Sequence, residues 1–217
     1  SSTSCARAAA GRASGMIGPH LGFEEPDQIL NYSKLKWMNP ASWAVRQRLV
    51  DVCGDLTRRY DIDGIHFDDY FYPYPEDGHK FEDQKDYQEY CQAGGQLSLG
   101  DWRRQNVNLA IEQVSQVIAA EKPYVRFGIS PFGLPAPGRP EGIAGFDQYE
   151  KLYADTQLWM DRGWVDYLAP QLYWPTTKTA QAFEPLINWW AQHSKDGRSI
   201  FAGVNFVGLG SQPSWDL

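Results

Sequence analysis

Residues 60–73 read YDIDGIHFDDYFYP, and this stretch indicates both the fold class and the place of the chemistry. Its centre, residues 64–68, is short and mostly apolar, and a turn-forming Asp-Gly pair opens it. A short, nearly continuous apolar run is typical of a parallel strand that is buried on both faces. Two adjacent carboxylates, Asp68 and Asp69, close the run and are followed by the aromatic residue Tyr70. The stretch therefore predicts a buried strand with an acidic, aromatic end.

Three more runs of this kind follow along the chain, and helical patterns separate them. The further predicted strands cover residues 125–130, 165–172 and 200–206. The predicted helices begin near Asn39 and then cover about 101–120, 147–162 and 179–193. Strict alternation of strand and helix predicts an α/β fold with a parallel sheet.

The helices are predicted from their apolar periodicity and from signals at their ends. Asn39 can cap the first helix, and Pro40 suits its first turn. In the second helix, apolar side chains recur at helical spacing along one face, at Val107, Ile111, Val114 and Ile118. Cys53 falls on the apolar face of the first helix, which predicts a buried side chain.

Each predicted strand ends in polar or aromatic residues, which favours a barrel over an open sheet. Barrel enzymes carry their chemistry at the carboxyl ends of the strands, and no glycine-rich phosphate turn points to a doubly wound sheet. A (β/α)8 TIM-type barrel needs eight strands, so we expect an incomplete barrel with about strands 4–7, and one weak strand near residues 16–21. A smaller or circularly rearranged α/β domain is the alternative.

The expected domain organisation follows from composition along the chain. Residues 1–18 are rich in small residues and are predicted to be linker or disordered, and residues 19–217 to form the partial barrel domain. Residues 70–100 and 131–147 are rich in Gly, Pro and charge, which predicts long loops after strand ends.

Overall composition excludes several classes of function. The 217 residues carry a net charge of −7, which makes the chain a poor candidate for binding nucleic acid. It holds no run of 18 apolar residues, so no membrane span is expected. The four histidines are scattered and the three cysteines show no metal-site spacing, so neither a metal nor another cofactor is expected. Nine Trp, 12 Tyr and 10 Phe indicate a large aromatic core or a cleft that stacks sugar rings, with a polysaccharide as the partner.

Asp68 and Asp69 form the predicted catalytic centre. Like charges held close together raise one pKa, and an apolar wall raises it further. A carboxyl group that stays protonated near neutrality can act as a general acid. The alternative is a strand-end pair that only caps the following loop. The aromatic flank and the position at the predicted barrel mouth favour catalysis.

Further polar and aromatic residues gather at or near the strand ends. Gln171 can bond sugar hydroxyls or an amide, Tyr173 can donate to a developing charge, and Trp174 can stack on a sugar ring or plug the core. His66 lies inside the first strand, either as a core or supporting histidine or as a proton shuttle. The predicted substrate-binding residues are His66, Tyr70, Ser130, Gln171, Tyr173, Trp174 and Asn205.

Several long strings of the sequence resemble one known family. They lie within roughly Lys36 to Gly210 and read WMNPASWAVRQRLVDV, RRYDIDGIHFDDYFYPYP, DWRRQNVN, RFGISPFG, LYADTQLWMDRGWVDYLAPQLYWP and AGVNF. Together they resemble the glycosyl-hydrolase-like 10 family. The resemblance implies a (β/α)8 barrel, export to the periplasm or cell surface, and cleavage of peptidoglycan glycan strands, with a preference for strands stripped of peptides.

A weaker likeness, at the level of the fold, runs to chitinases and N-acetylhexosaminidases. These enzymes place adjacent or nearly adjacent carboxylates after the fourth barrel strand and a tyrosine after the sixth. By this analogy we expect Asp69 to be the general acid and Asp68, with Tyr173, to orient the acetamido group of the substrate. Asp147 is an alternative second carboxylate, although its position also predicts a helix cap.

Two other functions remain open from the sequence. One is hydrolysis of another exopolysaccharide, such as partly deacetylated poly-N-acetylglucosamine. The other is a catalytically inactive, carbohydrate-binding barrel. Paired carboxylates disfavour the second, because a binding protein needs stacking surfaces but no acid pair.

Overall fold

The structure is a computed structural model that describes residues 28–206, and it is built on a parallel four-stranded sheet. The strands lie in chain order as β3 (Gly64–Phe67), β4 (Arg126–Ile129), β5 (Tyr167–Leu168) and β6 (Ser199–Ile200). A separate antiparallel hairpin consists of β1 (Ile29–Tyr32) and β2 (Leu35–Met38). The predicted α/β class and parallel sheet are confirmed, and closure into an eight-stranded barrel stays a prediction.

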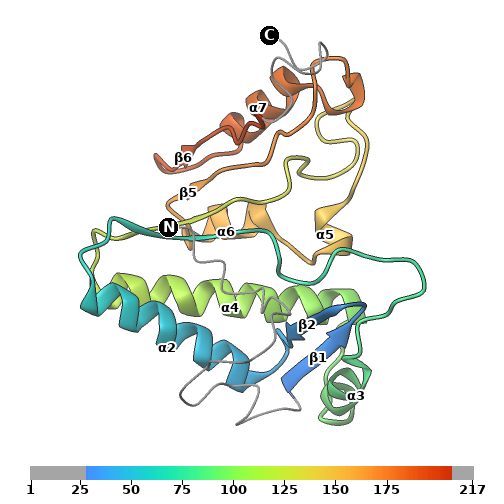
Figure 1. Ribbon diagram of the computed structural model, residues 1–217, viewed down its shortest axis with the longest axis vertical. Coiled ribbons are helices and arrows are strands. Elements are labelled where there is room, and N and C mark those ends of the chain that lie inside the picture. Colours follow the sequence, from blue (N-terminus) through green and yellow to red (C-terminus); the bar gives the residue numbers. More distant parts are fainter. Residues whose placement is uncertain (1–27, 207–217) are drawn as a thin grey trace.

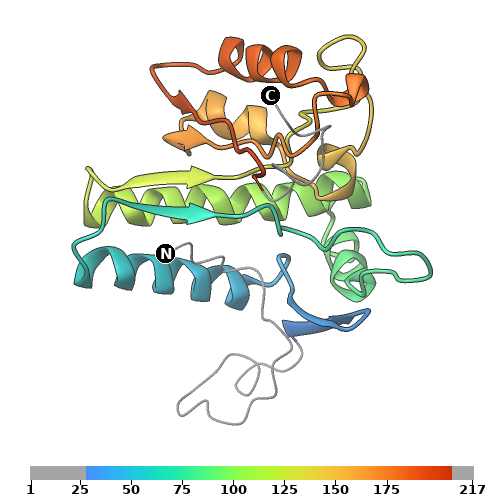
Figure 2. The ribbon, with the colours of Figure 1, turned by 45° about the horizontal axis from the view of Figure 1, so that its top comes forward.

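Two long helices cover one side of the sheet. The helices α2 (Trp43–Arg59) and α4 (Leu99–Glu121) pack along each other, and the ribbon views show β3 and β4 running along them (Figure 1, Figure 2). The remaining helices are α3 (Gln84–Gln92), α5 (Gln148–Lys151), α6 (Thr156–Arg162) and α7 (Phe183–Gln192), with a 3-10 turn η2 (Thr179–Gln181).

The core forms where the apolar stripe of α4 meets the sheet. The predicted stripe is confirmed, since Val107, Ile111, Val114 and Ile118 are all buried. They share one cluster with Phe67 of β3 and Phe127 of β4, whose rings meet edge to face at 5.0 Å. Cys53 is buried, as predicted. A second, smaller cluster holds Leu134, Ile143, Leu172 and Leu186.

The first helix begins later than predicted, because Ser42 and not Asn39 is its N-cap. The Ser42 hydroxyl accepts a hydrogen bond from the Val45 amide at 3.3 Å, which is the bond that satisfies a free N–H at a helix start. Asn39 instead donates to the Asp86 carboxylate at 2.9 Å. Pro40 therefore lies in the turn before the helix.

The predicted helix 147–162 is two helices, which is a correction. Asp147 caps α5, as predicted, but the chain leaves the helix after it and Tyr153 takes a left-handed backbone conformation with φ of 57°. Asp155 then caps α6 with its side chain. A second cap inside a periodic pattern divides it, because each cap supplies the acceptor that a new helix start needs. The last predicted helix is likewise divided into η2 and α7.

The third and fourth predicted strands are shorter than expected. Beyond β5, strand pairing continues as isolated bridges, from Gln171 to Phe132 and to Gly203. The predicted loop 70–100 contains the helix α3, and the hairpin β1–β2 was not predicted. The predicted linker and the weak strand near residues 16–21 lie outside the described residues. Within residues 28–206, no helix is long and apolar enough to cross a membrane.

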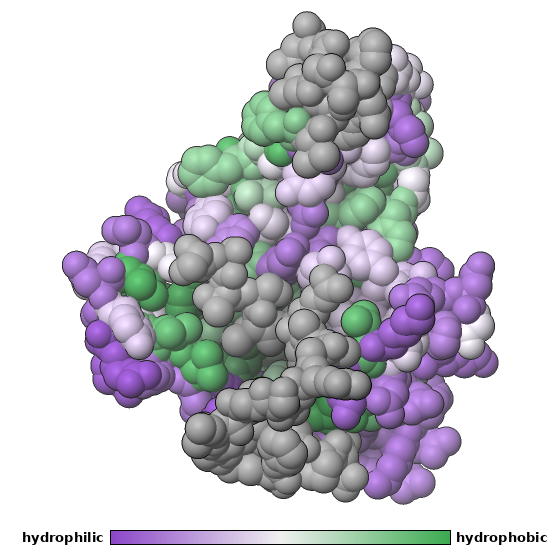
Figure 3. Space-filling view, viewed as in Figure 1, coloured by the Kyte–Doolittle hydropathy of each residue, from purple (hydrophilic) through white to green (hydrophobic). Residues whose placement is uncertain are grey.

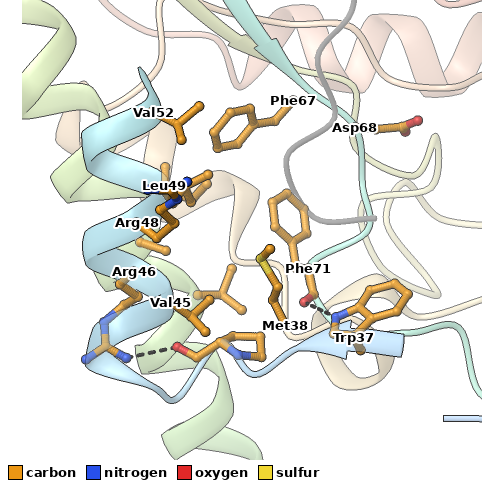
Figure 4. Close-up of a pocket in the computed structure, with 14 residues that line it drawn as sticks. Trp37, Met38, Val45, Arg46, Arg48, Leu49, Val52, Phe67, Asp68 and Phe71 are labelled. Atoms are coloured by element: carbon orange, nitrogen blue, oxygen red, sulfur yellow. Dashed lines mark hydrogen bonds between the residues drawn. The ribbon is translucent and has the colours of Figure 1, made fainter. Parts of the chain in front are cut away.

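An apolar groove of about 150 Å³ lies between α2 and β3. The close-up shows Leu49 and Val52 of α2 facing Phe67 and Phe71 (Figure 4). The space-filling view shows apolar side chains gathered at the lower left of this face, rimmed by hydrophilic ones (Figure 3). The groove therefore belongs to the helix side of β3.

Candidate active site

The candidate site lies at the carboxyl ends of β3, β4 and β5, where the sequence predicted it. Along β3, side chains alternate between the two sides of the sheet, so Phe67 is buried on the helix side and Asp68 points the other way. The close-up shows Phe67 directed toward α2 and the Asp68 carboxylate directed away from the groove (Figure 4). This alternation places Asp68 on the same side of the sheet as His66.

Gln171 joins the ends of three strands. Its Nε2 donates to Asp68 Oδ1 at 3.0 Å and to the Ser130 carbonyl at 2.9 Å. Asp68 Oδ1 also accepts the backbone N–H of Asp69 at 2.8 Å. Two donors thus fix the Asp68 carboxylate through one oxygen, and Oδ2 is the atom that could meet a ligand.

Asp69 is buried, with 2% of its surface exposed, whereas Asp68 is partly exposed. Asp68 is therefore the more accessible carboxylate of the pair. The Tyr74 hydroxyl donates a hydrogen bond to Asp69 Oδ2. Burial raises the pKa of Asp69 to about 6, against the opposing effect of the Tyr74 bond and with the added effect of the negative charge of Asp68.

No cation compensates this acid pair among the described residues. Nine ion pairs form within residues 28–206, and none includes Asp68 or Asp69. A buried carboxyl without a counter-ion favours its neutral form. Asp69 therefore binds its proton at a higher pH than an ordinary aspartate, with half of it protonated at about pH 6, beside the partly exposed Asp68.

His66 is part of a hydrogen-bonded line across the sheet. Its Nε2 lies 2.7 Å from Ser130 Oγ, and its Nδ1 lies 2.9 Å from the Tyr167 hydroxyl, so both ring nitrogens have protein partners. Burial lowers the pKa of His66, although the charge of Asp68 raises it, which favours the neutral ring. His66 thus has a hydrogen-bond partner at each ring nitrogen, one of them Ser130, and its role toward a ligand stays a prediction.

A glycine makes this line possible. The ring of Tyr167 stacks on His66 with centroids 5.5 Å apart and lies across β4 at Gly128. A Cβ at position 128 would lie 2.0 Å from the Tyr167 ring, so any other residue would displace it. Neither Gly128 nor Tyr167 was among the predicted site residues, because nothing in their local sequence marks a contact across strands.

Aromatic side chains line one flank of the site. Phe132 lies between Tyr74 and Trp174, with ring centroids at 6.4 and 5.4 Å, and Phe146 packs against Tyr74 at 5.1 Å. Trp174 is partly buried and also packs on the second apolar cluster. Tyr74, Phe132 and Phe146 were not predicted as site residues, although Tyr74 directly follows the stretch 60–73 that contains the acid pair.

Three other predicted residues have different positions relative to the acid pair. Tyr173 is 43% exposed, and its pKa is raised by burial and by the negative charges of Asp68 and Asp69. Tyr70 is partly buried, and its ring lies 6.0 Å from that of Tyr74. Asn205 follows the bridge between Gln171 and Gly203, and its role stays a prediction.

Two aspartates considered in the sequence lie away from the acid pair. Asp63 is exposed at the opposite end of β3, where its backbone carbonyl accepts a hydrogen bond from the Arg126 amide. Asp147 caps α5 by accepting the Glu150 amide at 3.1 Å. The described residues contain no cluster of three or more His, Cys, Asp or Glu that could hold a metal ion.

Comparison with known proteins gives the family. The model of the family described as glycosyl hydrolase-like 10 matches residues 19–215. The chain is 40% identical over 182 residues to the glycosyl hydrolase YngK of Bacillus subtilis, which covers 82% of the chain and 36% of YngK. It is 34% identical over 190 residues to the glycosyl hydrolase DigH of Escherichia coli K12, covering 82% of the chain and 42% of DigH. The chain thus spans about two fifths of the length of these relatives or less. It belongs to the glycosyl hydrolase-like 10 family.

Proposed function

We propose that this chain carries the catalytic carboxyl groups of a glycoside hydrolase that cleaves β-linked, N-acetylated glycans, with peptidoglycan glycan strands as the substrate. Family membership and two relatives named glycosyl hydrolase support the reaction class. The substrate follows from the family resemblance seen in the sequence. A substrate in the cell wall also requires a periplasmic or extracellular location, which is part of the proposal.

The observation that carries the proposal is the asymmetry of the acid pair. Asp69 is buried and has its pKa raised to about 6, while its neighbour Asp68 is partly exposed and held by two N–H donors. Environments that push two adjacent carboxyls apart in pKa are the usual means by which one serves as acid and the other as anion. Glycoside hydrolysis needs this division of roles.

The pair is too close in sequence to flank a sugar ring from two sides. Retaining enzymes that form a glycosyl-enzyme hold their two carboxyls about 5–5.5 Å apart, and inverting enzymes about 6.5–9.5 Å apart, across the bond that breaks. An acetamido group on the substrate removes this requirement, because its carbonyl oxygen can attack the anomeric carbon in place of a protein nucleophile. In this proposal Asp69 supplies the proton for the leaving oxygen, and Asp68 Oδ2 polarises the acetamido N–H.

Tyr173 and the aromatic flank complete the proposed site. Tyr173 follows Gln171 at the end of the same segment and is 43% exposed, and in this proposal its hydroxyl donates to the acetamido oxygen. Ser130, held by His66, offers a second hydroxyl at the neighbouring strand end. Trp174 and Phe132 present ring faces and edges of the kind that pack against the apolar faces of pyranoses.

The test measures product release from purified sacculi by the wild-type protein and by Asp68→Asn and Asp69→Asn variants. We expect both substitutions to reduce kcat by about 10²-fold or more, since each removes a group that acts in the transition state. Asp63→Asn is the matched control, because Asp63 is an exposed aspartate at the other end of the same strand. Equal activity of all four proteins would overturn the assignment of the pair.

Substrate and mechanism are separated by two further measurements. A panel of defined glycans distinguishes peptidoglycan strands from partly deacetylated poly-N-acetylglucosamine, and binding without any product indicates an inactive carbohydrate-binding protein. A thiazoline that mimics the cyclic oxazoline intermediate should inhibit competitively and tightly. Full turnover of a de-N-acetylated substrate, or a trapped glycosyl-aspartate, would contradict the participation of the acetamido group.

A further inference from the structure

The acid proposed above is sealed from the ligand side. Only 2% of Asp69 is exposed, and its two neighbours along the chain, Asp68 and Tyr70, are both more exposed. A general acid must lie within hydrogen-bond distance of the oxygen that it protonates, directly or through one intervening group. Asp69 therefore needs an intervening group if its proton is to reach a glycan.

Tyr74 is the side chain that contacts the sealed carboxyl and also reaches the surface. Its hydroxyl donates to Asp69 Oδ2, and the residue as a whole is partly exposed. Its ring begins the aromatic flank of the site, between Tyr70 and Phe132. Burial, the bond to Asp69 and the negative charges of Asp69 and Asp68 raise the pKa of Tyr74, so its hydroxyl keeps its proton in the resting site.

The segment that carries Tyr74 is fastened at Tyr74 itself and again further along the chain. The Tyr32 hydroxyl of β1 donates to the Tyr74 carbonyl at 3.1 Å and accepts the Glu76 amide at 2.7 Å. Further along, Asp83 is held by Arg103 of α4 through two hydrogen bonds of 2.5 and 2.8 Å. Two attachments to separate elements fix the phenol in place, as a group that transfers protons requires.

We propose that the Tyr74 hydroxyl is a catalytic residue that relays the proton of Asp69 to the leaving oxygen. This relay rests on the proposed function. The Asp69 carboxyl gives its proton to the phenol oxygen while the phenol gives its own proton to the glycosidic oxygen. The bond from that oxygen to the anomeric carbon breaks, the acetamido oxygen forms the new bond to this carbon, and the leaving sugar departs as an alcohol. Asp69 is then a carboxylate that accepts the Tyr74 O–H, which is the arrangement in the structure.

The relay returns to its starting state in the second half of the reaction. Water attacks the anomeric carbon, its proton passes to the phenol oxygen, and the phenol proton passes back to Asp69. The two transfers at Tyr74 are coupled because burial and the bond to Asp69 raise the pKa of Tyr74 above its ordinary value. A free phenolate is therefore not an intermediate. The ionisable groups around this proton path are Asp68, Tyr70 and Tyr173, together with Asp69 and Tyr74 themselves.

The leaving group of the substrate gives a direct test. A sugar alcohol needs protonation to depart, whereas an activated phenol such as dinitrophenol departs without it. We expect Tyr74→Phe to lower kcat/KM about 10²- to 10⁴-fold on a defined glycan and to leave the dinitrophenyl N-acetylglucosaminide nearly unaffected. Asp69→Asn should behave in the same way, and the double variant should be no worse than the poorer single variant, because both act in one proton path.

Tyr72→Phe is the matched control within the same segment. Tyr72 is buried, and its hydroxyl has no hydrogen-bond partner in the described structure, so this substitution tests loss of a phenol oxygen without loss of a contact. We expect unchanged kcat/KM on both substrates. Full activity of Tyr74→Phe on the glycan would overturn the relay, and an equal loss on both substrates would assign Tyr74 a structural role instead.

A titration separates the relay from the proposed function. The Asp69 carboxyl is followed by NMR in the wild-type protein and in Tyr74→Phe, with Asp69→Asn to assign the signal. Removing a donor that favours the carboxylate should move the Asp69 titration to higher pH. No upward movement would contradict the contact and with it the relay, whatever the activity. An upward movement in a protein that hydrolyses no glycan would confirm the contact while the proposed function, and the relay with it, fails.

Discussion

Asp69 and Asp83 are both buried aspartates in the segment that follows β3, yet their surroundings differ. Asp83 lies between two N–H groups of Arg103, and its side chain has no exposed surface. Asp69 instead contacts a phenol and lies next to a second carboxylate, that of Asp68. A buried anion with a bidentate counter-ion stabilises a fold, whereas one without it binds a proton. The difference separates an aspartate held for structure from one held for chemistry.

From this comparison we expect Asp83→Asn to change the stability of the fold more than any other substitution considered below. This substitution leaves the Arg103 guanidinium, whose side chain is 11% exposed, without a counter-ion. We expect the free energy of unfolding to fall by about 3–5 kcal/mol, which is typical when one member of a buried ion pair is removed. Chemical denaturation measures this value, and Glu82→Gln, at an exposed neighbouring position, is the control. If the free energy of unfolding falls by less than about 1 kcal/mol, the Arg103–Asp83 ion pair contributes no more to stability than a surface ion pair does.

Asp69→Asn should raise the free energy of unfolding, whereas Asp83→Asn lowers it. The folded pKa of Asp69 is about 6 and the unfolded value is about 3.9, so the folded state binds more protons between these values. The free energy of unfolding therefore falls as pH rises from about 4 to 6, and the full contribution is present only below the unfolded pKa. We expect Asp69→Asn to be more stable than wild type by about 2–3 kcal/mol at pH 7, with no difference below about pH 4.

Denaturation curves at pH 4, 5, 6 and 7 measure this difference. The Tyr74 hydroxyl can still donate to an amide oxygen, so the substitution removes a charge and keeps a hydrogen bond. The same titration predicts the activity profile, because a general acid must be protonated to act. We expect kcat/KM to be highest below about pH 6 and to fall as pH rises through that value. A stability loss for Asp69→Asn at pH 7 would mean that Asp69, like Asp83, is a structural anion.

Trp174→Ala tests whether an aromatic side chain at the site serves the core or the ligand. Trp174 packs on Phe132 and on the second apolar cluster, so both a core role and a ligand role are open to it. If a sugar ring stacks there, we expect glycan binding to weaken by about 1–3 kcal/mol, on the scale of burying one large side chain. Calorimetric titration with glycan fragments measures this, and Trp43→Ala, at an exposed position, is the control. Unchanged affinity with a lowered Tm would assign Trp174 to the core.

The smallest expected effect belongs to Tyr72→Phe, between the two aspartates in sequence. Its buried hydroxyl has no partner in the described structure. This hydroxyl gives up its hydrogen bonds to water on folding and forms none in the folded protein. Its removal should therefore leave the free energy of unfolding unchanged or raise it by less than about 1 kcal/mol. A loss of more than that, in thermal denaturation, would reveal a bond to this hydroxyl.

The sequence by itself determined the α/β class, the strand at residues 64–67 and the place of the acid pair. These follow from local rules: an apolar run of strand length, an apolar stripe at helical spacing and polar residues at strand ends. The same rules placed Asp147 as a helix cap and the α4 stripe in the core. The rule for strand ends also predicted Gln171 as a site residue, because the end of a strand can be recognised from the local sequence without knowledge of the neighbouring strands.

Only the tertiary structure decided which carboxylate is open and which is sealed. Asp68 and Asp69 are equivalent in a local pattern, and their difference comes from Tyr74 closing over Asp69 and from Gln171, 103 residues away, bonding Asp68. The break between α5 and α6 and the fit of Tyr167 over Gly128 likewise became visible only in the tertiary structure. Burial, pKa and partner choice depend on distances between segments that are remote in the chain, and a periodic pattern holds no information about those distances.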